Sequence, residues 1–123
     1  MMSVSTQVTQ PIQPTIQHCT TMPEVRAQID ALDARIVALI CERSGYVAQA
    51  GRIKQNASQI VDTPRIEAII QRVRAMAEAA DAPPAVLEAT YRAMIAAFIE
   101  FERGEFTRLQ ANKDNKDNNE EAA

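Results

Sequence analysis

The sequence has few of the residues that build tight turns, disulfide frameworks and metal sites. Its 123 residues include three glycines, two cysteines, one histidine and no tryptophan, and 4% are aromatic. Phosphate-cradling glycine loops and β architectures with many turns are therefore nearly excluded. Cys19 lies in a polar segment, and Cys41 lies in an apolar-periodic segment that predicts a buried, small apolar side chain. We interpret this usage as reduced thiols and expect a cytoplasmic protein.

Charge and hydropathy exclude further classes of function. The formal net charge is −3 and 24% of the residues are charged, so the basic stripe that nucleic-acid binding requires is missing. No apolar run approaches the roughly 20 residues of a membrane span, and residues 1–19 lack the basic and apolar regions of a signal peptide. We expect neither a nucleic-acid nor a membrane partner. The lone His18 supports no metal site, and no motif predicts a cofactor.

The chain divides into one helical domain with two polar ends. Residues 1–22 are rich in Thr, Gln, Ser and Pro without a period, which predicts a disordered leader. Residues 111–123 are polar throughout and predict a frayed or disordered tail. Between them, residues 23–110 are alanine-rich and strongly favour helix.

Apolar residues spaced by three and four predict three helices, long, short and long. Proline and capping residues mark the helix starts, a polar break separates the first two helices, and a double proline separates the last two. No strand-like alternation competes, so the predicted fold class is all-α. The predicted ranges are about 23–55, 62–81 and 86–110.

The first predicted helix is too long for one small chain to cover. At 1.5 Å per residue it spans about 48 Å. It cannot bury its whole apolar stripe against a short second helix and one other neighbour. We expect obligate association with a second copy, most often a symmetric dimer; the alternative is a monomeric three-helix bundle with frayed ends.

Cations occupy positions on this helix where the period calls for apolar residues. Arg43 lies four residues from both Leu39 and Val47. Lys54 follows Arg43 by eleven residues, which returns it to within about 20° of the same face and about 16 Å along the axis. The pair could bracket one small anion, or each side chain could snorkel out of a core edge. Arg26, about 25 Å upstream, could reach the same ligand only from an antiparallel partner helix.

Glu102 poses a similar choice on the third predicted helix. It lies four residues after Phe98 on the apolar seam. A carboxylate there is costly unless it is paired or protonated, and a protonated one could donate a hydrogen bond. The alternative is that Glu102 faces solvent beside Arg103. Arg65, near Asp62 at the start of the second helix, is most simply a surface residue.

Three segments together resemble the all-helical (AroQ-type) chorismate mutases. The family's first helix is similar to the run VRAQIDALDARIVALICERSGYVAQAGRIK, and its three cations match Arg26, Arg43 and Lys54. Its second-helix start is similar to DTPRIEAIIQRV, which carries Asp62 and Arg65.

The third segment is YRAMIAAFIEFE, which places Glu102 where the family commonly has glutamine and sometimes glutamate. The resemblance covers roughly residues 24–110 and leaves both ends unexplained. The ordered set at fixed spacing is more specific than any single residue in it.

The resemblance implies an intertwined homodimer with two equivalent sites, each taking Arg26 from the partner chain. It also implies the cofactor-free Claisen rearrangement of chorismate to prephenate in aromatic amino-acid biosynthesis. By this resemblance Arg26 and Arg43 would bind the substrate carboxylates, and Lys54 would bind a carboxylate and the ether oxygen. Glu102, when protonated, would donate to that oxygen. The other substrate-binding residues that we expect are Asp62, Arg65, Ile66, Ile95, Phe98 and Ile99.

Two positions depart from the mutase pattern. Ile66 and Phe98 stand where many members carry a glutamate and a serine near the ring hydroxyl of the substrate. Apolar residues there resemble the related isochorismate-pyruvate lyases of salicylate and siderophore formation, which also share the short segment between Lys54 and Arg65. Those lyases keep glutamine at the position of Glu102, and we favour the mutase. A catalytically inactive helical dimerisation module is a further alternative.

Overall fold

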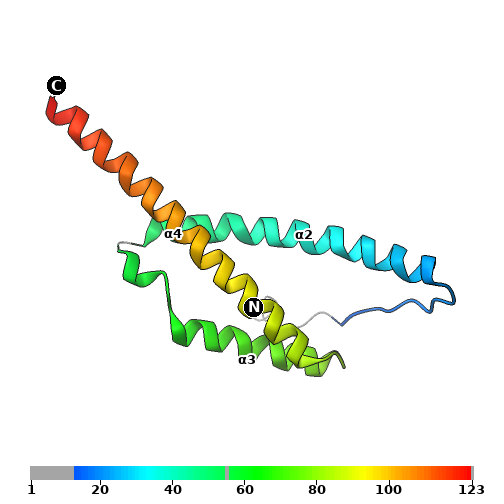
Figure 1. Cartoon of the computed structure of the whole chain (residues 1–123). Coiled ribbons are helices and arrows are strands. Elements are labelled where there is room, and N and C mark those ends of the chain that lie inside the picture. Colours follow the sequence, from blue (N-terminus) through cyan, green and yellow to red (C-terminus); the bar gives the residue numbers. More distant parts are fainter. Residues whose placement is uncertain (1–12, 55, 123) are drawn as a thin grey trace, which may run out of the picture.

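A computed structural model describes residues 13–54 and 56–122 (Figure 1). Within them the chain forms helices α2 (Met22–Ile53), α3 (Thr63–Ala79) and α4 (Pro84–Ala122), with a short 3-10 helix η1 (Ala57–Gln59) after α2. No strand occurs in this described part, so the predicted all-α class with a long, a short and a long helix is confirmed. Most of the predicted leader, residues 1–12, lies outside the described residues.

Local side-chain chemistry sets the ends of α2 and α3 close to their predicted positions. Thr21 and Asp62 are the N-caps, and each side chain accepts a hydrogen bond from the backbone N–H three residues later. Pro23 and Pro64 occupy the first turns, where a missing N–H costs nothing. After α3, Asp81 adopts a left-handed backbone with φ 58°, and the prolines of the turn follow.

The predicted end of the last helix is wrong. The sequence predicts an end near Gln110 and a frayed or disordered tail over residues 111–123, but α4 continues to Ala122. Residues 111–122 contain neither glycine nor proline, so nothing stops the backbone hydrogen-bond ladder. Gln110 also donates to Asp114 one turn later, at 3.4 Å. The polarity of this segment therefore indicates solvent exposure, because residues 111–119 are all exposed.

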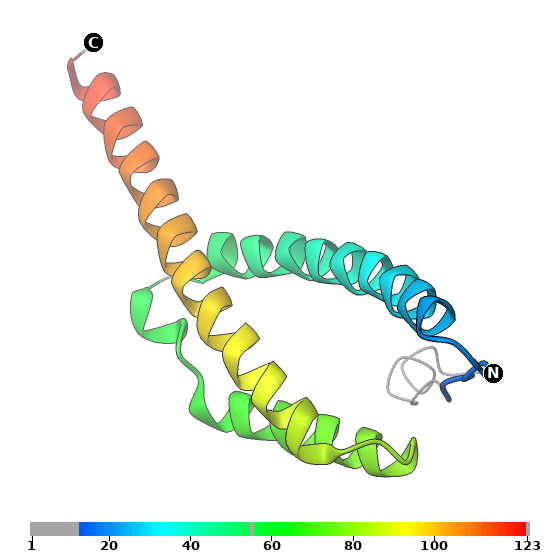
Figure 2. The same ribbon diagram turned by 45° about the vertical axis from the view of Figure 1, so that its right-hand side comes forward.

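The other two α-helices, α2 and α3, both pack against α4. Figures 1 and 2 show α4 crossing the C-terminal end of α2 and running alongside α3, with its own C-terminal part projecting beyond both. The core cluster between α3 and α4 contains Ile69, Ile70, Val73 and Ile95, of which Ile70 is fully buried. Burial of apolar area here is the main stabilising contribution within the single chain.

Contact between α2 and α4 is centred on Gly51, which is the buried residue of α2. A Cβ at this position would lie 3.5 Å from Cγ of Glu102 and 3.7 Å from its backbone oxygen. These are ordinary van der Waals distances, so Gly51 packs directly against α4 at the crossing of the two helices.

The N-terminal part of α2 makes no comparable contact. All of residues 26–42 are exposed, and we call them the free segment of α2. Both views show it standing away from α3 and α4 (Figures 1 and 2). Six large apolar side chains of the segment are 38–62% exposed: Ile29, Leu32, Ile36, Val37, Leu39 and Ile40.

The predicted burial of Cys41 is wrong for the same reason, since Cys41 is exposed on the part of α2 that α4 does not reach. The apolar periodicity of the free segment faces no core within the single chain. None of the helices in the described part of the chain is long and apolar enough to cross a membrane.

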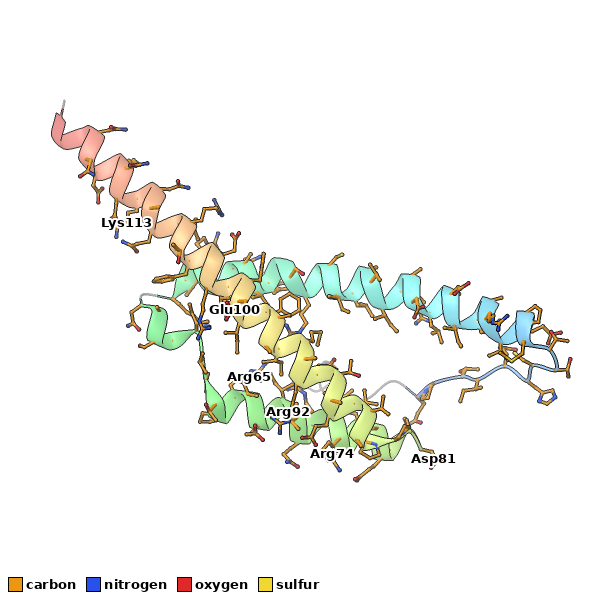
Figure 3. All side chains as sticks on the ribbon, in the orientation of Figure 1. Arg65, Arg74, Asp81, Arg92, Glu100 and Lys113 are labelled. Atoms are coloured by element: carbon orange, nitrogen blue, oxygen red, sulfur yellow. The ribbon has the colours of Figure 1, made fainter. Side chains whose placement is uncertain are left out.

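An ion-pair network joins α3 and α4. Figure 3 labels two of its members, Arg74 and Arg92. Arg92 of α4 binds both carboxylate oxygens of Glu67 on α3 at 2.9 Å and one oxygen of Glu88 at 2.8 Å. Arg74 of α3 donates to the same Glu88 at 2.7 Å. Hydrogen bonds from Arg92 lower the pKa of Glu67 and of Glu88, and Arg74 adds to the effect at Glu88.

We expect this network to make the folding stability depend on pH. Because the pKa of both glutamates is lowered in the folded protein, their stabilisation is present above the usual value of 4.5 and is lost as the pH falls through the lowered folded values. Arg92→Met should therefore lower the melting temperature more at pH 7 than at pH 3, as measured by circular dichroism. Arg103→Met is the matched control. In the described residues Arg103 pairs with Glu100 on the same helix, so its removal breaks no ion pair between α3 and α4. Equal losses at both pH values for Arg92→Met would contradict the assignment.

Candidate functional site

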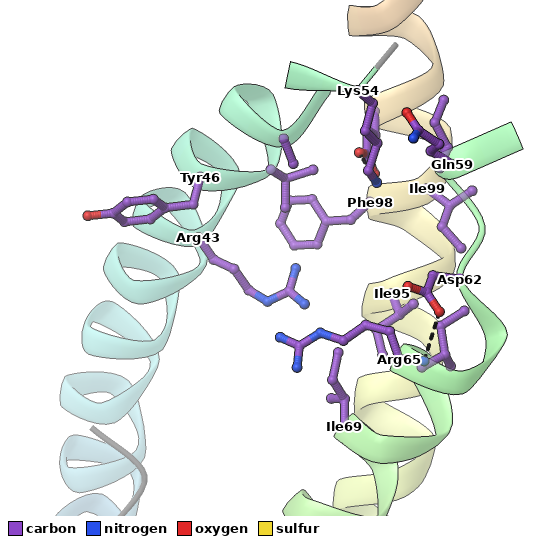
Figure 4. A pocket seen from close by; sticks show the side chains of 15 residues that line it. Arg43, Tyr46, Lys54, Gln59, Asp62, Arg65, Ile69, Ile95, Phe98 and Ile99 are labelled. Carbon is purple, nitrogen blue, oxygen red and sulfur yellow. Dashed lines mark hydrogen bonds and ion pairs between the residues drawn. The ribbon is translucent and has the colours of Figure 1, made fainter. Parts of the chain in front are cut away.

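A pocket of about 510 Å³ lies between α2, α3 and α4 (Figure 4). Its walls come from the C-terminal third of α2, from η1 and the start of α3, and from the middle of α4. A volume of this size is typical of small-molecule sites. Nine of the ten predicted site residues line it: Arg43, Lys54, Asp62, Arg65, Ile66, Ile95, Phe98, Ile99 and Glu102.

The tenth residue, Arg26, is not among the lining residues. It is exposed near the N-terminal end of α2, seventeen residues before Arg43. On a continuous helix this separation is about 25 Å. The structure therefore does not bring Arg26 to the pocket of its own chain, and its delivery by a partner chain stays a prediction.

Lys54 and Glu102 form an ion pair at one end of the pocket. Nζ of Lys54 lies 2.5 Å from Oε1 of Glu102, and the two side chains are 25% and 8% exposed. Lys54 caps the C-terminus of α2, and Glu102 lies on α4 against Gly51. Burial of Glu102, one of the two possibilities that the sequence left open, is thus confirmed. The ammonium group compensates the charge of the buried carboxylate.

Two guanidinium groups enter the pocket from opposite sides. Figure 4 shows Arg43 on α2 and Arg65 on α3 with their guanidinium ends pointing toward one another. Within the described part of the chain, neither guanidinium has a carboxylate partner within 4.0 Å. The nearby Asp62 accepts from the backbone N–H of Arg65 at 3.0 Å and so caps α3. Guanidinium groups without an acidic partner favour an anionic ligand, and they bind carboxylates through two parallel hydrogen bonds.

Most of the remaining lining residues of the pocket are apolar. Ile66 and Ile69 come from α3, and Ile95, Phe98 and Ile99 come from α4. A pocket that combines guanidinium groups with apolar side chains suits an organic anion with a hydrophobic body better than an inorganic ion. In the described residues, no cluster of His, Cys, Asp and Glu is arranged to hold a metal ion.

Sequence reasoning missed six of the lining residues, which are Tyr46, Val47, Ala50, Gln59, Ile60 and Ile69. Val47 and Ala50 lie four and seven residues after Arg43, so the period that linked Arg43 to Lys54 could have found them. Gln59 and Ile60 had no such signal. The short 3-10 helix η1 places them, and Asn56 caps this helix through a capping box. The sequence predicts only a polar break in this stretch.

Comparison with known families matches the same part of the chain. A model of the family chorismate mutase type II matches residues 25–103, well over half of the sequence. The matched range contains all ten predicted site residues, from Arg26 to Glu102. No curated protein matches the chain.

We expect Lys54 and Glu102 to be strongly coupled in folding stability. Lys54→Met removes the cation and leaves a buried carboxylate unpaired. This should lower the free energy of unfolding by about 3 kcal/mol, the low end for a buried pair, because the Lys54 side chain is 25% exposed. Adding Glu102→Gln removes the stranded charge, so the double variant should recover more than half of that loss. Urea denaturation of the two single variants and the double variant at pH 7 measures the coupling. Additive losses would show that the two side chains do not act as a pair.

Proposed function

Since the chain belongs to the chorismate mutase type II family, we propose that it catalyses the Claisen rearrangement of chorismate to prephenate in aromatic amino-acid biosynthesis. Membership of the family supports a chorismate mutase-type function. The observation that carries the specific proposal is the convergence of Arg43, Lys54 and Arg65 on one partly apolar pocket. Chorismate matches this lining, because it has two carboxylates on a small unsaturated ring.

The proposed reaction needs shape and charge rather than a nucleophile. The ether C–O bond breaks while a new C–C bond forms within the same molecule, so the two ends of the substrate must be held together in a compact conformer. Arg43 and Arg65, which face each other across the pocket, are suited to bind the substrate's anionic side and restrict it. We propose no cofactor and no metal for this step.

Lys54 is the residue best suited to stabilise the breaking bond. Negative charge develops on the ether oxygen in the transition state, and a preorganised cation stabilises that charge. The ammonium group has three N–H donors, of which the contact with Glu102 uses one. The others are available for a substrate carboxylate and the ether oxygen. Glu102 holds the ammonium in place when ionised, and when protonated it would itself donate to the ether oxygen.

A second candidate function is that of an isochorismate-pyruvate lyase. The observation favouring it is that Ile66 and Phe98 both line the pocket. Neither side chain can hydrogen-bond a hydroxyl group on the substrate ring. We favour the mutase, because the lyases that the chain resembles keep glutamine where this chain has Glu102. The third possibility, an inactive helical dimerisation module, predicts turnover of neither substrate.

We further propose that the functional unit is a cytoplasmic homodimer. The free segment of α2 exposes six large apolar side chains, a face that a second copy would cover. Arg26 lies at the start of the same segment and cannot reach its own pocket. In an antiparallel pair of α2 helices it would instead enter the pocket of the partner. The two free cysteines agree with a reducing compartment.

The purified protein should convert chorismate to prephenate. Arg43→Ala should lower kcat/KM by about 100-fold or more, because a charge-assisted contact to a carboxylate is lost. Arg72→Ala on α3, outside the pocket, is the matched control and should leave the rate unchanged. Parallel incubation with isochorismate should yield neither pyruvate nor salicylate. Pyruvate and salicylate without any prephenate would establish the lyase, and turnover of neither substrate would rule out both enzymes.

Mixing two inactive variants tests the shared site. Arg26→Ala and Arg43→Ala homodimers should each be nearly inactive, but a heterodimer has one pocket with both arginines intact. With random exchange of subunits the mixture should regain about a quarter of the wild-type activity. Light scattering should show dimers for all of the samples. Dimers that exchange subunits but recover no activity would refute the delivery of Arg26 across the interface.

A further inference from the structure

The two cations that α2 places in the pocket are held by different means on the same face of α4. Lys54 is paired with the carboxylate of Glu102. The guanidinium carbon of Arg43 instead lies over the ring of Phe98, 4.8 Å from its centroid. Phe98 and Glu102 are four residues apart on α4, so they are neighbours on one helix face.

The Phe98 ring also contacts a second aromatic ring. Phe101, one turn later on α4, meets it edge to face, with 6.2 Å between the ring centroids and an interplanar angle of 75°. This is a favourable arrangement of two aromatic rings. The Phe98 ring therefore contacts both Arg43 on α2 and another ring of its own helix.

A ring face holds a guanidinium group in a way that a carboxylate does not. The attraction is between the positive charge and the negative face of the ring, and it involves none of the N–H donors. A carboxylate partner would occupy two of the five donors of the group. Arg43 is thus restrained while its N–H donors remain available for a ligand. Lys54, in contrast, donates one of its N–H groups to Glu102.

We propose that Phe98 is a positioning residue for Arg43: its ring holds the guanidinium group toward the pocket with the N–H donors free for a carboxylate of the ligand. The identity of that ligand rests on the proposed function, but the contact between ring and guanidinium does not. Phe98 is therefore more than a part of the apolar wall. An aliphatic side chain would fill the same space and leave the long Arg43 side chain without a restraint.

The first arm of the test observes Arg43 without any ligand. In protein with 15N-labelled arginine, the ring current of Phe98 should shift the side-chain resonances of Arg43, which Arg43→Lys identifies. Phe98→Leu should abolish this shift, and Phe98→Tyr, which keeps a ring, should retain it. Phe106→Leu, the same change on the same helix but outside the pocket, is the control and should alter nothing. Circular dichroism verifies that each variant is folded.

The second arm measures turnover of chorismate by the same variants. Phe98→Leu should raise KM by about 3- to 30-fold, the factor expected for a cation–π contact, with a much smaller change in kcat. Phe98→Tyr should restore KM to near the wild-type value. If Phe98 only filled space, Phe98→Leu and Phe98→Tyr would change the stability of the protein and would not raise KM alone.

The two arms separate failure of this inference from failure of the proposed function. If wild-type protein shows no ring-current shift at Arg43, or if Phe98→Leu leaves that shift and KM unchanged, the positioning role is wrong even though turnover is normal. If neither chorismate nor isochorismate reacts, the proposed function is wrong, and the resonance measurements alone decide whether Phe98 holds Arg43.

Discussion

The pocket depends on how α2 and α3 are arranged around α4. Each of them packs against α4, but at different places along it, so the space between α2 and α3 is lined from three sides. Gly51 packs against α4 where α2 and α4 cross, and the ion pair between Lys54 and Glu102 lies directly beside that crossing. The opposed guanidinium groups of Arg43 and Arg65 follow from this arrangement, since one is carried by α2 and the other by α3. A shift of α4 would alter every wall of the site at once.

Core and pocket also share residues. Ile69 and Ile95 belong to the buried cluster between α3 and α4, and both line the pocket. The same stripe of α4 continues through Phe98 and Ile99 to Glu102, with spacings of three and four residues. Packing that stabilises the fold at one end of the stripe therefore fixes the position of the charged groups at its other end. This continuity explains how a chain with few buried side chains can still present an ordered site.

The local parts of the fold were predictable from the sequence, and the parts that depend on distant contacts were not. Caps and prolines locate the starts of α2 and α3, because those signals act within a few residues. The spacing of Arg43 and Lys54 predicted a common face for the same reason. Whether Glu102 is buried and Cys41 exposed depends on which part of α2 meets α4, and no periodicity within one helix contains that information. The prediction of a frayed or disordered tail at the polar end of α4 is wrong, because a solvated helix and a disordered tail have similar compositions.

The free segment of α2 has a consequence for how the protein responds to dilution. If a second copy covers it, as proposed, the burial of its apolar side chains requires two chains to meet. The stability of the fold and the number of complete sites then both depend on the concentration of chains. At low concentration the fraction of assembled sites would fall faster than the amount of protein. A cell that makes few copies would thus have disproportionately little active enzyme, with no regulatory ligand involved.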